Sequence, residues 1–128
     1  MRLKNFNIAI GSQFFKACSE EPRIRILHLI LHNNEMCISD LEHVLDFSQT
    51  KTSRHVTYLK NSGILKLRKS DQWVLYSLKE EMVDLVQMIF NLLQKDPTLK
   101  ADMETFNTLF SNRELAINKL RVTEWPAR

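Results

Sequence analysis

The sequence has little glycine, proline and cysteine. Its 128 residues include only two glycines, three prolines and two cysteines. Such a composition leaves few linkers or disordered stretches, and the abundance of Leu, Ile, Lys and Glu favours helix. Two cysteines, Cys18 and Cys37, do not make a disulfide framework, and a reducing compartment would keep them as thiols. We therefore expect one mainly helical domain with a sizeable core.

Long apolar runs and catalytic motifs are also missing. No apolar stretch approaches the roughly 20 residues of a membrane span, and the first residues lack the apolar core and cleavage site of a signal peptide. No nucleophile-base constellation, glycine-rich phosphate loop or complete metal site is visible. These absences predict a cytoplasmic protein that is not an enzyme, needs no cofactor or metal and binds no membrane.

One segment lacks negative charge altogether. Between Phe47 and Lys69 there are six Lys or Arg residues and no Asp or Glu. Because the whole chain has a net charge of only +3, the rest of the chain is net negative. Positive charge concentrated in this way is typical of a surface that binds polyphosphate.

Helix-capping signals surround the start of this basic segment. Ser39 and Glu42 form a capping-box pattern for a short helix that continues through Leu45. Ser48 is suited to cap the next helix, 48–61, and Gly63 is suited to end it in a left-handed conformation. Two short capped helices separated by a tight turn predict a helix-turn-helix.

The helix 48–61 has two chemically different faces. Thr52, Val56 and Leu59 have the spacing of a face that packs on the core. The opposite face carries donors, cations and an aromatic ring, which suit base edges and phosphates. The residues of that face are Thr50, Lys51, Arg54, Thr57, Tyr58 and Asn61. The alternative is an ordinary solvated helix face.

A β-hairpin is expected directly after this helix. Residues 64–68 and 73–78 alternate apolar with other side chains, and 69–72 read as the turn. A hairpin here is a wing, 64–78, whose basic residues would add affinity through the DNA backbone or minor groove. The fold expected is mainly α, a winged helix-turn-helix with a two-stranded wing and a C-terminal helical extension. Residues 1–94 would form the DNA-binding and dimerisation domain, and 95–128 its extension.

Two helical segments are apolar on more than one side. These are residues 6–18 and the stretch from Met82 to Leu93. A helix that is apolar on two sides needs two partners, which predicts a homodimer interface built from both ends of the domain. Pro22 should begin a helix that ends near Asn33, and Asp96-Pro97 should begin another. A further capping box, Ser111 with Glu114, would divide the tail into two helices.

Taken together, these motifs resemble the arsenic-repressor (ArsR/SmtB) family over about residues 8–94. The segments that carry the resemblance are Glu21–Leu27, Glu35–Leu41, Ser48-Gln49, Ser53–Val56, Leu59–Leu65, Trp73 and Tyr76. The resemblance implies a homodimeric winged helix-turn-helix transcription factor, usually a repressor that a metal, metalloid or oxidant releases from DNA.

The sensing residues of that family are incomplete here. Members that sense arsenite or cadmium carry a Cys-x-Cys pair where this chain has Cys37-Ile38-Ser39, and serine is a poor ligand for a soft ion. Zinc-sensing members use Asp and His from the last helix, but residues 79–94 contain no histidine. The inducer is therefore unknown.

Other side chains offer partial sensing chemistry. Cys18 and Cys37 would suffice for a redox-switchable pair or an incomplete metalloid site, or they are simply small buried apolar side chains. His28 and His32 stand one helical turn apart, a spacing that suits Zn²⁺ but that also fits a solvated helix edge.

The function expected is sequence-specific binding of double-stranded operator DNA by a homodimeric repressor. The alternative is a winged-helix module for protein assembly, but such a module has no need to exclude every carboxylate from the basic segment. Operator, regulated genes and the sign of regulation are not specified. The residues expected to contact DNA are Ser48, Gln49, Thr50, Lys51, Ser53, Arg54, His55, Thr57, Tyr58, Lys60, Lys66, Arg68 and Lys69.

Overall fold

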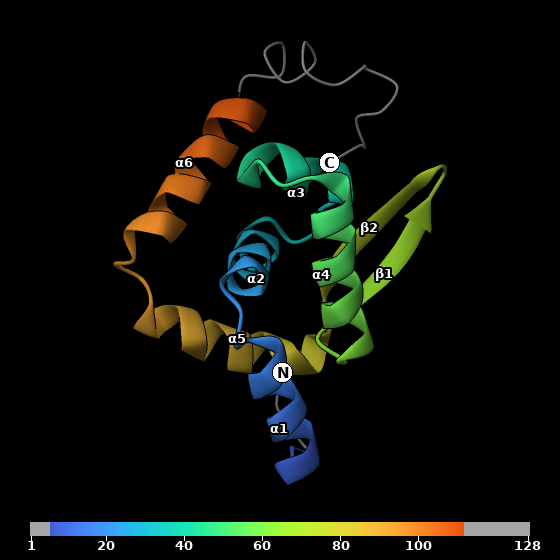
Figure 1. Ribbon diagram of the computed structural model, residues 1–128, viewed down its shortest axis with the longest axis vertical. Coiled ribbons are helices and arrows are strands. Elements are labelled where there is room, and N and C mark those ends of the chain that lie inside the picture. The colour runs from blue at the N-terminus through green and yellow to red at the C-terminus, as the bar shows by residue number, and fades with distance from the viewer. Residues whose placement is uncertain (1–5, 112–128) are drawn as a thin grey trace.

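The computed structural model describes residues 6–111, and α2 lies at the centre of this part of the chain (Figure 1). The helices α3, α4, α5 and α6 surround α2, while α1 and the hairpin project outward. The mainly helical winged helix-turn-helix predicted from the sequence is confirmed. The elements are α1 (Ile8–Ala17), α2 (Glu21–Asn33), α3 (Ile38–Leu45), α4 (Gln49–Asn61), β1 (Leu65–Ser70), β2 (Trp73–Leu78), α5 (Glu80–Leu92) and α6 (Pro97–Ser111).

Local capping sets several helix boundaries as expected. Pro22 lies in the first turn of α2, and the Ser48 hydroxyl accepts a hydrogen bond from the Lys51 N–H at 3.1 Å. At the start of α6 an Asp96 carboxylate oxygen accepts from the Leu99 N–H at 3.0 Å. Gly63 follows α4 with φ +81°, a conformation that glycine adopts without steric cost.

The cap predicted for α3 was wrong. Cys37 is the N-cap residue, and its N–H donates to Asp40 Oδ2 at 3.4 Å, so Ser39 already lies within the first turn. The reason is tertiary: a β-bridge joins Met36 to Tyr76, with N–H to oxygen distances of 3.0 and 2.9 Å. This bridge fixes the chain just before Cys37, and the helix begins immediately after it.

The wing is longer than the sequence pattern indicated. Strands β1 and β2 pair antiparallel from Leu65 opposite Leu78 to Ser70 opposite Trp73. Lys69 and Ser70 are therefore strand residues, and the turn contains only Asp71 and Gln72. Asp71 takes a positive φ of 56°, which Asp tolerates better than most residues.

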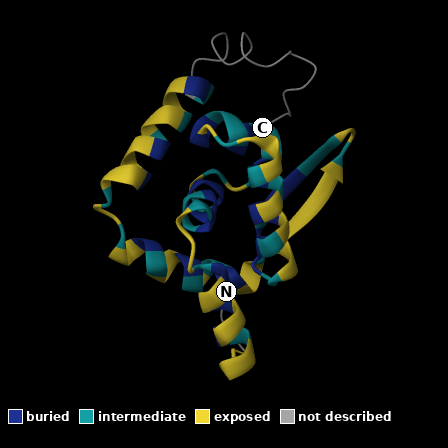
Figure 2. Cartoon of the chain, viewed as in Figure 1, coloured by how far each residue is buried: buried dark blue, intermediate teal, exposed yellow. Residues whose placement is uncertain are grey.

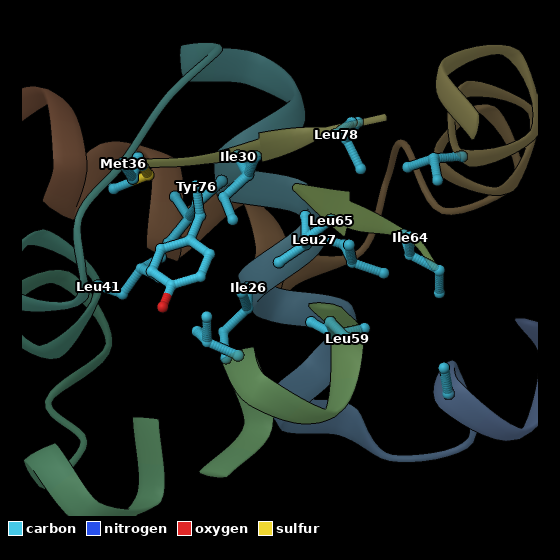
Figure 3. Packing of buried hydrophobic residues seen from close by; sticks show 14 of the residues in the cluster. Ile26, Leu27, Ile30, Met36, Leu41, Leu59, Ile64, Leu65, Tyr76 and Leu78 are labelled. Carbon is cyan, nitrogen blue, oxygen red and sulfur yellow. The ribbon is translucent and has the colours of Figure 1, made fainter. Parts of the chain in front are cut away.

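The core forms where α2 meets the helix-turn-helix and the wing. Figure 3 shows Ile26, Leu27 and Ile30 of α2 packed among Leu41, Leu59, Met36 and other apolar side chains. These α2 side chains are at most 1% exposed. Burial of one such side chain contributes roughly 1.5–3 kcal/mol. Figure 2 shows that the outer faces of α5 and α6 are exposed whereas α2 is largely buried.

Helix α6 packs against α2 and α3. Leu99 and Leu109 are buried, and Asp102 of α6 forms a bidentate ion pair with Arg25 of α2, with both N to O distances 2.9 Å. The predicted start of this helix at Asp96-Pro97 is confirmed. The predicted capping box of Ser111 and Glu114 extends beyond the described residues.

No helix within residues 6–111 is long and apolar enough to cross a membrane.

Candidate nucleic-acid interface

Helix α4 presents one polar face to solvent. Its buried face contains Thr52, Val56 and Leu59, each 0% exposed, as the spacing predicted. The opposite face carries side chains that donate hydrogen bonds or positive charge, and none of them is a carboxylate. The exposed members are Gln49, Thr50, Arg54, Thr57 and Lys60; Lys51, Ser53 and Tyr58 are partly exposed, and Ser48 is exposed at the cap.

The turn between α3 and α4 helps to orient one of these cations. Asp46 ends α3 with a left-handed φ of 57°, which suits the short Asp side chain, and Phe47 follows it. The Lys51 Nζ lies 4.0 Å from the centre of the Phe47 ring, within cation–π range. The aromatic ring thus holds the ammonium group at the start of α4.

Arg23 is a buried residue behind α4 that the sequence analysis did not assign. It is 4% exposed, and its Nε donates to the Ala17 carbonyl at 2.6 Å while Nη2 donates to the Lys16 carbonyl at 3.2 Å. Its guanidinium lies 4.0 Å from the centre of the Tyr58 ring. Arg23 therefore ties the end of α1 to α4. The available sequence signal was its position four residues before Leu27, on the apolar stripe of α2.

His55 differs from the other residues expected to contact DNA. It is only 3% exposed, with Nδ1 3.5 Å from Arg23 Nη1 and Nε2 3.4 Å from Arg54 Nη2. Burial lowers the pKa of His55, and the positive charges of Arg54 and Arg23 lower it further. An uncharged imidazole has one acceptor nitrogen, so His55 accepts a hydrogen bond from only one of the two guanidinium groups at a time. The structure places it behind the polar face rather than on it.

The wing carries its three basic residues on exposed positions of β1: Lys66, Arg68 and Lys69. Arg68 already has an internal partner. Its Nε and Nη2 donate to the two carboxylate oxygens of Glu35 at 2.6 and 2.8 Å, which raises the pKa of Arg68. This pair joins β1 to the segment before α3. The sequence did not reveal it because the two residues are far apart in the chain.

The two cysteines occupy different environments. Burial raises the pKa of Cys18 to about 11, although the nearby Arg23 lowers it in part, so Cys18 is a thiol at neutral pH. A thiol reacts far more slowly than a thiolate. Cys37 is 4% exposed at the start of α3.

Metal-ligand chemistry is incomplete around Cys37. Position 39, where the resemblance implies a second cysteine, is Ser39, and within residues 6–111 no three His, Cys, Asp or Glu side chains lie close enough together to hold a metal ion. The residues present therefore do not fit a thiolate-rich site for cadmium or arsenite.

A helix-turn-helix with a polar, cationic second helix, followed by a hairpin wing, defines a winged helix-turn-helix DNA-binding protein. The model of the bacterial regulatory protein arsR family matches residues 20–66. The chain is 32% identical over 95 residues to the cadmium resistance transcriptional regulatory protein CadC of Listeria innocua, a match that covers 73% of this chain and 80% of that protein.

Two further comparisons agree. The arsenical resistance operon repressor of Escherichia coli is 44% identical over 66 residues, which cover 52% of this chain and 56% of that protein. The structure of HlyU from Vibrio cholerae superposes with a TM-score of 0.62 at 30% identity, covering 70% of this chain and 97% of that one. The chain therefore belongs to the ArsR family of DNA-binding transcriptional regulators, which are not enzymes.

Proposed function

We propose that this chain is a homodimeric repressor that reads operator DNA with α4 and holds the backbone with its wing. The observation that carries the proposal is the segment from Phe47 to Lys69, whose own side chains include six that are basic and none that is a carboxylate. Carboxylates there would repel phosphates, so their absence suits the surface to DNA. Residues 1–94 would form the DNA-binding and dimerisation domain, with 95–128 as its extension, in the cytoplasm.

Different residues would carry specificity and affinity. The polar side chains on the first two turns of α4 are placed to enter the major groove, where base edges are distinguishable. Tyr58, Lys60 and the wing residues Lys66, Arg68 and Lys69 would hold phosphates. The major-groove set is Gln49, Thr50, Lys51, Ser53, Arg54 and Thr57, with Ser48 contributing at the cap. His55 would act through Arg54.

Exposed apolar side chains on α1 and α5 support the dimer. Ile8 and Phe15 of α1 are 90% and 61% exposed, and Met88 and Leu92 of α5 are 63% and 84% exposed. Large apolar side chains left in solvent on two helices indicate an interface. A two-fold axis through this interface would place two α4 helices on half-sites about one helical turn, or roughly 10 base pairs, apart.

A footprint on the DNA upstream of the chain's own coding region tests the proposal. The experiment uses reduced protein, oxidised protein and a Cys18→Ser variant, so that it also tests a thiol switch between Cys18 and Cys37, against which the raised pKa of Cys18 argues. A two-fold symmetric protected site is expected. If oxidation abolishes protection by the parent protein but not by the variant, the result supports the thiol switch. If oxidation leaves protection unchanged, the thiol switch is excluded. If the protein protects no DNA even at low salt concentration, the proposal that it is a repressor is contradicted.

A further inference from the structure

A pocket of about 510 Å³ lies where α2, α5 and α6 meet, away from the DNA-facing surface. Its walls include His28 and His32 of α2, Gln87 and Asn91 of α5, and Lys100 and Glu104 of α6. This volume falls within the range of about 300–1,000 Å³ that is usual for small-molecule sites. Helix α6 completes the pocket, so the C-terminal extension is part of the site.

The pocket walls combine apolar surface with hydrogen-bonding groups. Phe90 and Met103 supply apolar wall, and the His28 ring packs edge-to-face on Phe90 and on His32, with centroid distances of 5.1 and 4.6 Å. On α5 the Gln87 amide donates to the Asn91 carbonyl oxygen at 3.0 Å. Aromatic edges and side-chain amides suit a flat ligand that has its own hydrogen-bonding groups.

The charges around the pocket oppose a charged ligand. Lys100 and Glu104 stand one turn apart on α6 with opposite formal charges, so each disfavours an ion that the other attracts. Burial, and to a lesser extent His32, lowers the pKa of His28 to about 4, so this imidazole is neutral at neutral pH. An anion would therefore meet Glu104 and a cation would meet Lys100, so neither sign of charge is favoured over a neutral ligand.

His28 also has an unsatisfied polar atom. The residue is 8% exposed, and its Nδ1 is buried with no hydrogen-bond partner among the described residues. Buried polar atoms are almost always paired, and exceptions call for an explanation.

From these observations we propose that the pocket binds a small, uncharged aromatic molecule with an amide- or hydroxyl-type group, and that binding shifts α6 and so alters DNA affinity. The second half rests on the proposed function; the first half does not.

Contacts connect α6 to the DNA-facing surface. Asp102 of α6 holds Arg25 through the bidentate pair, and the Arg25 guanidinium lies 5.2 Å from the centre of the Phe47 ring. The other cation on that ring is Lys51 of α4. A shift of α6 would move Arg25 against Phe47 and change how Lys51 is held. The effect expected is a change in affinity for operator DNA.

Titration of the full chain with benzamide, benzoate and benzylamine tests the ligand class, because the three probes share one ring and differ in charge. Isotope-labelled protein is followed by NMR. We expect saturable shifts of the Gln87 and Asn91 side-chain amides, with an affinity for benzamide about threefold or more above that of either ion. Tighter binding of an ion, or shifts that do not saturate, would overturn the proposal.

Two tryptophan variants on α6 locate the site. Glu104→Trp places a large ring at the pocket wall and should weaken benzamide binding about tenfold. Thr105→Trp is the matched control, since this neighbour is exposed and does not line the pocket, and it should leave binding unchanged. Equal affinity in both variants would place the probe elsewhere and contradict the pocket.

The DNA measurement separates the two halves of the proposal. Affinity for the upstream DNA is measured in the parent and in Asp102→Asn, with and without saturating benzamide. A change in the parent that is reduced in Asp102→Asn supports the connection through Arg25. Saturable benzamide binding with unchanged DNA affinity would overturn the regulatory half alone. If the protein without benzamide does not bind the DNA, the proposed function as a repressor is contradicted instead.

Discussion

Arg54 and Lys69 both carry exposed positive charge, but they lie on different elements of the interface. Arg54 projects from α4, where a bidentate contact with a base is worth about 1–3 kcal/mol of discrimination. We expect Arg54→Ala to remove most specific binding, and Lys69→Ala to weaken binding to all sequences and lower the salt slope by about one. Electrophoretic mobility shifts on operator and random DNA at several salt concentrations measure both. Equal losses on both DNAs for both variants would contradict this division.

Arg23 should matter for stability rather than for base contacts. Its replacement by methionine keeps much of the volume but leaves the Ala17 carbonyl without its buried donor, whereas the Lys16 carbonyl still accepts from Ser19. The expected loss is about 3 kcal/mol of unfolding free energy, since hydrogen bonds from charged groups are among the stronger ones. Urea denaturation of Arg23→Met measures it. Lys16→Met is the control, because only its backbone takes part; a similar loss there would contradict the assignment.

His28 should make the protein less stable in acid. Its pKa is about 4 in the folded chain and about 6.5 when unfolded, so between these pH values only the unfolded state binds the proton. The contribution of the neutral His28 to the free energy of unfolding is therefore fully present above pH ~6.5 and is lost as the pH falls towards ~4. We expect a loss of about 2 kcal/mol, because one unit is worth about 1.4 kcal/mol and solvent screens part of the shift.

Urea unfolding of the parent and of His28→Leu at a series of pH values measures this contribution. Asp96 and Asp102 raise the pKa of His28 and partly offset the effects of burial and His32. The decrease in unfolding free energy between pH ~6.5 and ~4 should be smaller in His28→Leu than in the parent by about 2 kcal/mol. An identical pH dependence in both proteins would show that His28 titrates normally.

The predictability of the site also differs from residue to residue. The polar face of α4 followed from helical periodicity because Thr52, Val56 and Leu59 are neighbours on one helix. The buried position of His55 was missed although it has the same periodicity, since positions 52, 55, 56 and 59 form one helix face. Its contact with Arg23 of another helix could not be foreseen. Pairs that form across the chain leave no periodic signal in the sequence.

At the scale of elements, helix boundaries with local causes could be predicted from the sequence, whereas a boundary with a tertiary cause could not. Ser48, Gly63 and Pro22 act on their own helices, and the boundaries that they predicted were found. The start of α3 was missed because the bridge between Met36 and Tyr76 decides it. Caps can be read from sequence where no distant strand constrains the chain.

The position of α6 should depend on the pair between Arg25 and Asp102. Asp102 is nearly buried whereas Arg25 is 26% exposed, so removal of the carboxylate leaves a partly solvated cation. We expect Asp102→Ala to lower stability by about 1–2 kcal/mol and to speed hydrogen exchange in α6 more than in α4. Exchange measured by mass spectrometry tests this. The exposed Glu104→Ala should change little, and uniform acceleration in α4 and α6 would contradict a local role.

At the scale of the whole molecule, the exposed apolar residues of α5 should determine the oligomeric state. Leu92→Glu places a charge on the proposed interface, and two-fold symmetry introduces it twice. Loss of two buried leucines at about 1.5 kcal/mol or more each raises the dimer dissociation constant at least about 100-fold. Sedimentation velocity measures the change. Thr108→Glu on α6 is the control, and a Leu92→Glu protein that remains dimeric would contradict this interface.

The pair between Arg68 and Glu35 gives the wing an internal counterion. A lysine that meets a DNA phosphate releases salt ions to the solution, and this release drives binding. Arg68 would exchange a carboxylate of its own chain for a phosphate, so it gains less entropy than Lys66 or Lys69. Breaking this exposed ion pair has a cost, and that cost falls as added salt screens the pair. The same pair joins β1 to the segment before α3, so an Arg68 that turned to a phosphate would loosen this connection between the wing and the helix-turn-helix.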